Sequence, residues 1–164
     1  MPGSDRLRYA GLPRPAIMRP AGRIQNGVGK LLETVMDKYQ ALREAGTNGA
    51  NYDLDTDAVI GHLREWDAKY GIELSDASSD SVVVLFDRLP DDAGSLADDV
   101  YAFCPDTVDQ HFGCFKEMLE MHEDAVPEDL RELVEGVDLE DENYGVELLR
   151  KSIVSTKAVR LWWD

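Results

Sequence analysis

The chain has 164 residues, 43% of them apolar, and its 33 acidic and 17 basic residues give a formal net charge of −16. This length fits one domain, and the apolar share is large enough for a buried core, which excludes global disorder. A body this negative repels nucleic acid and anionic membranes, so neither is an expected partner, and it attracts basic surfaces on other proteins. No apolar run approaches the roughly 20 residues that span a bilayer, and no apolar segment follows the N-terminal arginines, so we expect a cytoplasmic protein.

Positive charge gathers at the N-terminus. Residues 1–30 carry six basic residues and one acid (+5), whereas the other residues carry eleven bases and 32 acids (−21). Four of the seven prolines lie in the first twenty residues, and proline fixes φ and removes a backbone hydrogen-bond donor. We therefore expect residues 1–25 to form a flexible basic arm and residues 26–164 to form a single acidic domain.

Apolar residues at helical spacing predict two helices at the start of this domain. The first begins near Asn26 and continues until Gly46, which stops it. The second begins around Thr56, whose side chain we expect to cap the first turn, and ends at Gly71, a residue type that tolerates the left-handed conformation common at helix C-termini.

The remaining elements predict an α+β fold. Residues 81–86 read Ser-Val-Val-Val-Leu-Phe, and a continuous β-branched run of this kind is typical of a strand buried on both faces. A second strand is predicted at 158–163. Between the strands, helices are predicted from Pro90 to Cys104 and at 109–122, 128–135 and 144–152. We expect a small central sheet covered by several helices.

Two kinds of cysteine site are disfavoured by the sequence. A zinc site would use Cys104, His111, Cys114 and His122, but their gaps of six, two and seven residues differ from the short paired spacings of structural zinc sites. A Cys–His nucleophile pair would need a lowered thiol pKa, and the acids that follow Cys104 have the opposite effect. No complete catalytic motif is present, and we expect no metal and no cofactor.

The strongest local charge feature is the acidic stretch 117–147, which contains thirteen acids and one base, Arg131. One interpretation is a solvated surface that keeps the protein in solution. The other is a binding face for a basic protein, to which electrostatic steering would speed association. For this second interpretation the predicted partner-binding residues are Glu128, Asp129, Glu132, Asp138, Glu140, Asp141 and Glu142 for charge, with Tyr144 as an apolar anchor.

Three short motifs resemble those of an uncharacterised bacterial domain family. They are Leu63-Arg64-Glu65-Trp66 followed by Tyr70-Gly71, then Phe103-Cys104-Pro105-Asp106 with Gln110, and Leu161-Trp162-Trp163-Asp164. They match an L-x-x-W…(Y/F)-G helix end, an F-C-P-D segment and a closing W-W-D. The similarity covers roughly residues 55–164, and an acidic insert near 124–147 lengthens the span between the last two motifs.

The resemblance brings no established reaction. It implies a small single-domain protein of the kind found near polymorphic toxin genes, some of which serve as immunity proteins. We therefore expect a protein-binding inhibitor with no catalytic residues, an immunity protein that occludes the basic active site of a cognate toxin. Two alternatives stay open: an enzyme of unknown reaction with a pocket at the F-C-P-D and W-W-D segments, and a phage-encoded nucleic-acid mimic that counters host defence.

Overall fold

The computed structural model describes residues 37–121 and 126–164. The predicted arm at 1–25, the start of the first predicted helix and the first two residues of the predicted insert lie outside the described residues. The described part belongs to one structural unit, Val35–Asp164. Among the described residues, no helix combines the length and the apolar character needed to cross a membrane.

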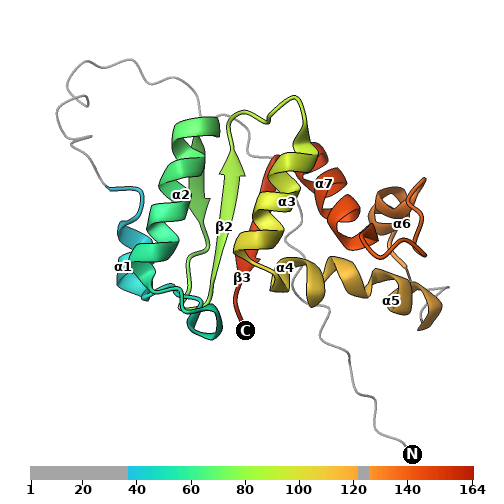
Figure 1. The fold of residues 1–164 in the computed structure, drawn as a ribbon, viewed down its shortest axis with the longest axis horizontal. Coiled ribbons are helices and arrows are strands. Elements are labelled where there is room, and N and C mark those ends of the chain that lie inside the picture. The colour runs from blue at the N-terminus through green and yellow to red at the C-terminus, as the bar shows by residue number, and fades with distance from the viewer. Residues whose placement is uncertain (1–36, 122–125) are drawn as a thin grey trace, which may run out of the picture. The chain divides into compact units, whose positions relative to one another are not determined.

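Three antiparallel strands form the sheet, in the order β1-β2-β3 (Figure 1). The central strand β2 (Ser81–Phe86) and the edge strand β3 (Ala158–Trp162) confirm the two predicted strands. The other edge strand, β1 (Ile72–Ser75), was not predicted. It consists of only four residues and is separated from the preceding helix by Gly71 alone, so its sequence alternation is too short to indicate a strand.

The sheet is buried on one face rather than on both. Val82, Val84 and Phe86 of β2 are buried, and the register places Val84 beside Leu74 and Val159 on the same face. Leu85 points the other way and is 41% exposed. The prediction of a strand buried on both faces was therefore wrong, because a run of apolar residues does not reveal which neighbours cover each side of an antiparallel sheet.

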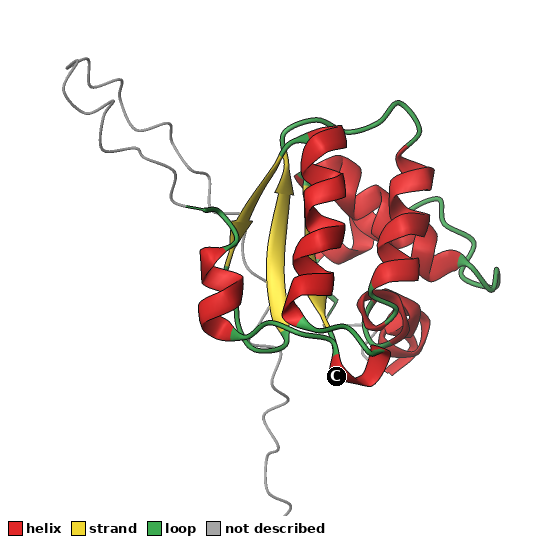
Figure 2. Cartoon of the chain, turned by 60° about the vertical axis from the view of Figure 1, so that its left-hand side comes forward, coloured by secondary structure: helices red, strands yellow, loops and turns green. Residues whose placement is uncertain are grey.

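Helices make up most of the rest of the described chain, and Figure 2 shows most of them on one side of the strands. In chain order they are α1 (Gln40–Ala45), η2 (Ala50–Tyr52), α2 (Thr56–Tyr70), α3 (Ala93–Phe103), α4 (Asp106–Asp109), η3 (Phe112–Cys114), α5 (Phe115–Met121), α6 (Glu128–Val134) and α7 (Tyr144–Thr156). Together with the sheet they form a single α+β domain, as predicted.

Aromatic side chains join the sheet to the helices. Phe86 of β2 contacts Trp66 and Tyr70 of α2, with ring centroids 5.9 and 6.0 Å apart. Trp66 is fully buried and also meets Phe103 of α3 edge-on at 5.6 Å. Helix α3 packs in turn along α7, whose Leu148, Leu149 and Ile153 are buried. This pairing of α3 with α7 places residues of both helices around one hollow.

The structure corrects two details of the first two predicted helices, whose predicted starts were near Asn26, outside the described residues, and around Thr56, where α2 does begin. In the described residues the first helix begins at Gln40 and does not continue through Tyr39, because the Asp37 side chain accepts the Tyr39 N–H at 3.1 Å and holds a turn there. Helix α2 has the predicted span, but its N-cap is Asp55 rather than Thr56. The Asp55 carboxylate accepts the N–H of Ala58 at 2.8 Å.

The helix predicted at 109–122 is interrupted. The chain forms α4, then the short helix η3, then α5. The interruption lies where Gly113 meets the start of α7: a Cβ on Gly145 would lie 3.0 Å from the Gly113 Cα and 2.8 Å from Val108 Cγ1. This close approach is a contact between distant segments, which explains why helical spacing alone did not reveal the break.

Candidate functional site

Asp106 of the F-C-P-D segment accepts hydrogen bonds from three other residues, two of which are distant in the sequence. Its Oδ1 accepts the Tyr52 hydroxyl at 2.6 Å and the Gln110 amide at 3.0 Å. Its Oδ2 accepts the Asp164 N–H at 2.9 Å. We call Tyr52, Asp106, Gln110 and Asp164 the Asp106 cluster. The Asp106 side chain therefore does not cap α4; it joins η2 and Asp164, which follows β3, to the helix.

These hydrogen bonds shift the pKa values of Asp106 and Tyr52. Burial raises the pKa of Asp106, but the hydrogen bonds from Tyr52, the Asp164 N–H and Gln110 outweigh it, so the pKa is lowered overall. The same contact raises the pKa of Tyr52 to about 12, because the hydroxyl donates to a carboxylate and ionising it would lose that bond. Asp106 is 4% exposed, so its charge is stabilised inside the protein rather than offered to a ligand.

The neighbouring residues of the F-C-P-D and W-W-D segments also form contacts within the protein. The Trp163 side chain is buried, and its indole N–H donates to the Phe103 carbonyl at 3.3 Å. The Cys104 thiol donates to the Trp162 carbonyl at 2.9 Å, and burial raises its pKa above the ordinary value. A raised thiol pKa disfavours the thiolate that a nucleophile or metal ligand would need. These residues hold β3 against α3 and α4.

The predicted acidic residues divide between a helix and a loop. Glu128, Asp129 and Glu132 are exposed on α6, while Asp138, Glu140, Asp141 and Glu142 lie exposed in the loop between α6 and α7. Glu140 forms an ion pair with Lys116 at 2.7 Å. The side chains of Asp138 and Asp141 each accept a nearby loop N–H, at 3.0 and 2.8 Å, and so hold the loop's shape.

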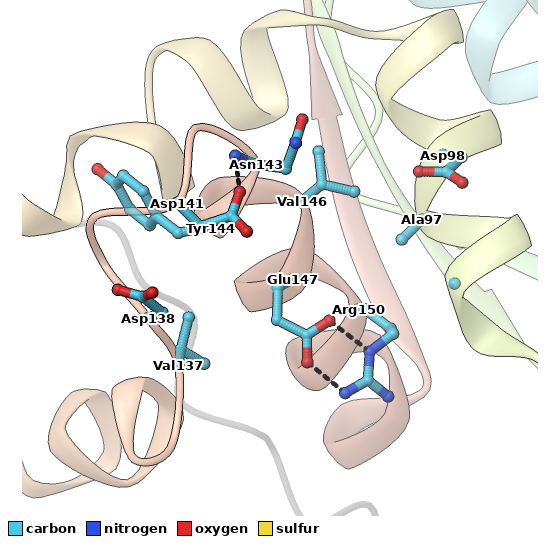
Figure 3. A pocket seen from close by; sticks show the side chains of 11 residues that line it. Ala97, Asp98, Val137, Asp138, Asp141, Asn143, Tyr144, Val146, Glu147 and Arg150 are labelled. Carbon is cyan, nitrogen blue, oxygen red and sulfur yellow. Dashed lines mark hydrogen bonds and ion pairs between the residues drawn. The ribbon is translucent and has the colours of Figure 1, made fainter.

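A hollow of about 380 Å³ lies between this loop, α3 and α7. We call it the large hollow. Its charged residues are Asp98, Asp138, Asp141, Glu147 and Arg150. Its less polar wall includes Ala97, Val137, Tyr144 and Val146. Figure 3 shows Asp98 on one side, Asp138 and Asp141 on the other, and Glu147 with Arg150 between them.

Arg150 is the only basic residue lining the large hollow among the described residues, and it is already paired. Its Nε and a terminal nitrogen donate to the two Glu147 oxygens at 2.8 and 2.5 Å. This two-pronged contact raises the pKa of Arg150 and lowers that of Glu147. Four carboxylates and one guanidinium give the hollow a formal charge of −3, and no described base forms an ion pair with Asp98, Asp138 or Asp141.

A second hollow of about 250 Å³ adjoins the first, and we call it the small hollow. It shares Asn143, Tyr144 and Val146 with the large hollow and adds Asp109 and Glu142 as its charged residues. Asp109 accepts the Tyr101 hydroxyl at 3.0 Å. No described basic residue lines the small hollow, so its formal charge is −2.

The structure brings together only part of the predicted site. Asp138, Asp141, Glu142 and Tyr144 line the two hollows, whereas the acids of α6 and Glu140 do not. Tyr144 is half-buried, and its hydroxyl donates to the Gly113 carbonyl, so it forms a wall rather than a projecting anchor.

Three lining residues outside the predicted set are Asp98, Glu147 and Arg150. The three-residue spacing of Glu147 and Arg150 in a predicted helix could have indicated their ion pair. No local pattern points to Asp98, which reaches the site because α3 packs against α7.

No group of three or more histidine, cysteine or acidic side chains in the described chain is arranged to hold a metal ion. Cys104 is buried and Cys114 is exposed, and His122 lies outside the described residues. The positions of these residues therefore do not define a metal centre within the part that the structure describes.

The fold and these surfaces define a small α+β protein with two adjoining acidic hollows, which we together call the acidic groove, and a buried carboxylate, Asp106, that is hydrogen-bonded within the protein. The chain belongs to the family described as Domain of unknown function (DUF4253), whose model matches residues 31–164. The expected membership in an uncharacterised domain family is thus confirmed. Comparison with curated proteins and with solved structures found no match.

Proposed function

We propose that this protein is a cytoplasmic inhibitor that binds a basic protein, and specifically an immunity protein that neutralises a cognate toxin by covering the toxin's basic active site. The observation that carries the proposal is the large hollow, where Asp98, Asp138 and Asp141 face a common space without a described basic partner. Carboxylates gathered in this way repel one another, and a cation from another protein relieves that repulsion when it binds.

The exposed acids around the hollows extend the negative electrostatic field of the large hollow over a wider area. Glu128, Asp129 and Glu132 of α6 and the loop acids carry charges suited to steering a basic partner toward the groove. Surface charges of this kind act mainly on the association rate and weaken with salt. The less polar wall of the large hollow adds buried contact area, which charge alone does not supply.

An enzyme with a pocket at the F-C-P-D and W-W-D segments has less support. Neither the large nor the small hollow is lined by Cys104, Asp106 or Asp164. The Asp106 carboxylate already accepts three hydrogen bonds, and catalytic acids and bases need a lone pair or proton directed at substrate. A nucleic-acid mimic that blocks a defence enzyme would use the same occlusion, and the identity of the partner would separate it from an immunity protein.

Co-expression with the toxin encoded by an adjacent gene tests the proposal. We expect restored growth and a complex that co-elutes on gel filtration. The test variant changes the seven predicted acids of the acidic region to their amides: Glu128, Asp129, Glu132, Asp138, Glu140, Asp141 and Glu142. The matched control makes the same change at seven exposed acids elsewhere: Asp53, Asp57, Glu65, Glu73, Asp76, Asp87 and Asp91.

The two variants lose the same total charge, so only the location of the lost charge differs. We expect the test variant to lower affinity by at least about tenfold, mainly through slower association, and the control to retain most of the affinity, since charges near the partner's basic surface steer it more than distant ones. No rescue and no complex with the wild-type chain would refute the proposal. Equal losses in both variants would show that net charge matters and the acidic region does not.

A further inference from the structure

We propose that the two hollows together bind an extended peptide segment of the partner, with one basic side chain in each hollow. This inference rests on the proposed function and names the chemistry that the partner presents. The two hollows share the wall formed by Asn143, Tyr144 and Val146. A chain crossing this wall would therefore place neighbouring side chains on either side of it.

Each hollow has its own group of carboxylates. Asp98, Asp138 and Asp141 belong to the large hollow, whereas Asp109 and Glu142 belong to the small one. Glu147 is already paired with Arg150. The charge is thus distributed over two adjoining spaces rather than concentrated at one point, and two separate cations match this distribution better than one.

The walls suit the long side chains of arginine and lysine. Ala97, Val137 and Val146 line the large hollow alongside its carboxylates. Arginine and lysine place an aliphatic stem on apolar surface while the charged head stays among polar groups. The Arg150 guanidinium already lies in this hollow on the Glu147 carboxylate, which shows that the lining accommodates this group. Arginine gains further from two-pronged contacts with carboxylates.

Other occupants fit these hollows less well. Volumes of about 380 and 250 Å³ are near or below the lower end of the roughly 300–1,000 Å³ typical of small-molecule pockets. A second copy of the chain carries the same formal charge of −16, and like-charged surfaces repel. Nucleic acid is excluded by the same sign of charge.

Synthetic peptides test the proposal with the full-length protein. Each peptide is capped at both ends and carries two arginines separated by zero to three glycines. In matched peptides, one arginine is replaced by citrulline, which keeps the shape and removes the charge. Binding is followed by the amide shifts of the ¹⁵N-labelled protein. We expect one spacing to bind at least about tenfold more tightly than either citrulline peptide, because linked contacts reinforce each other. Shifts should occur at Asn143, Tyr144 and Val146.

Three variants with the same loss of charge locate the binding. D138N/D141N changes the large hollow, D109N/E142Q the small hollow, and E128Q/D129N only the exposed surface of α6. We expect each of the first two to reduce binding of the two-arginine peptide to that of a one-arginine peptide. We expect the third to change it less than twofold. A thermal melt of each variant checks that it is folded.

Equal losses in all three variants, shifts elsewhere, or no binding at any spacing would overturn this inference. A complex with the toxin would still be able to form through the acids of α6. In that case the inhibitor proposal would be retained, and the proposal that each hollow binds a basic side chain would be rejected. Conversely, peptide binding without any toxin complex would support the binding of a basic segment in the two hollows and would refute the immunity function.

Discussion

Asp106 and Asp138 are both acidic residues of the same small domain, and their surroundings differ completely. Asp106 is buried and accepts three hydrogen bonds from Tyr52, Gln110 and Asp164. Asp138 is exposed at the large hollow, where its one described hydrogen bond comes from its own loop. The difference indicates that the first charge stabilises the fold and that the second remains available to a partner. Mutations in the two regions should therefore separate stability from binding.

The largest expected effect is the loss of Trp163. We expect W163A to lower the free energy of unfolding by about 3–5 kcal/mol, since a large buried ring leaves a cavity behind. The neighbouring Trp162 is only partly buried, so W162A is the control and should cost less. Urea denaturation measures both changes. Similar losses in the two variants would contradict the assignment of Trp163 to the core.

Asp106→Asn should have the next largest effect. We expect a loss of about 2–3 kcal/mol at neutral pH, because an amide cannot replace all the hydrogen bonds that the buried carboxylate accepts. The folded state lowers the pKa of Asp106 below its ordinary value of 3.8. Its stabilisation is therefore complete above that value and is lost as the pH falls through the lowered pKa.

The pH dependence provides the control for Asp106. Urea unfolding of the wild type and D106N should show a difference that shrinks in acid. A difference that stays constant down to about pH 2 would mean that the charge of Asp106 contributes nothing to stability.

A smaller effect on stability is expected from the two histidines that the structure describes, His62 and His111, because burial shifts the pKa of both. Burial lowers the pKa of His62 and His111 below the ordinary 6.5. His62 stacks on Phe103 at 3.9 Å, and its Nε2 has no hydrogen-bond partner among the described residues. Protonating a histidine in such a site costs free energy. For His62 the nearby carboxylate of Asp99, whose Oδ1 lies 3.9 Å from Nε2, reduces this cost. Stability should thus fall as the pH drops below 6.5.

The H62F/H111F variant isolates this contribution. We expect its urea midpoint to fall less than that of the wild type between about pH 7 and about pH 5, because the variant has no ring to protonate at either position. Phenylalanine keeps an aromatic ring for the contact with Phe103. Parallel curves for the two proteins would assign the acid sensitivity to other groups.

The smallest effect on stability is expected at the large hollow. D138N/D141N should change the free energy of unfolding by no more than about 0.5 kcal/mol, as is usual for exposed positions. The change should be toward greater stability at low salt, since two repelling charges are removed. Thermal melts at low and high salt measure it. A large loss would show that these acids, like Asp106, stabilise the fold.

Much of the secondary structure was predictable because its causes are local. Helix α2 is defined by apolar spacing and by Gly71 at its end, and α3 ends before Pro105. The run in β2 has strong β propensity. In contrast, β1 is a strand because Ile72 and Leu74 pair with Phe86 and Val84. The break between α4 and α5 likewise depends on packing of Gly113 against Gly145.

The sequence by itself determined the acidic character of the domain, its α+β class and the loop carrying Asp138 and Asp141. Only the tertiary structure decided which acids line the same hollow and which are buried and hydrogen-bonded within the protein. Asp98 joins the large hollow through the packing of α3 on α7, and Asp106 meets the Asp164 N–H across 58 residues of sequence. The physical reason is that charge and helical propensity belong to short segments, whereas burial and hydrogen-bond partners arise from contacts between distant ones.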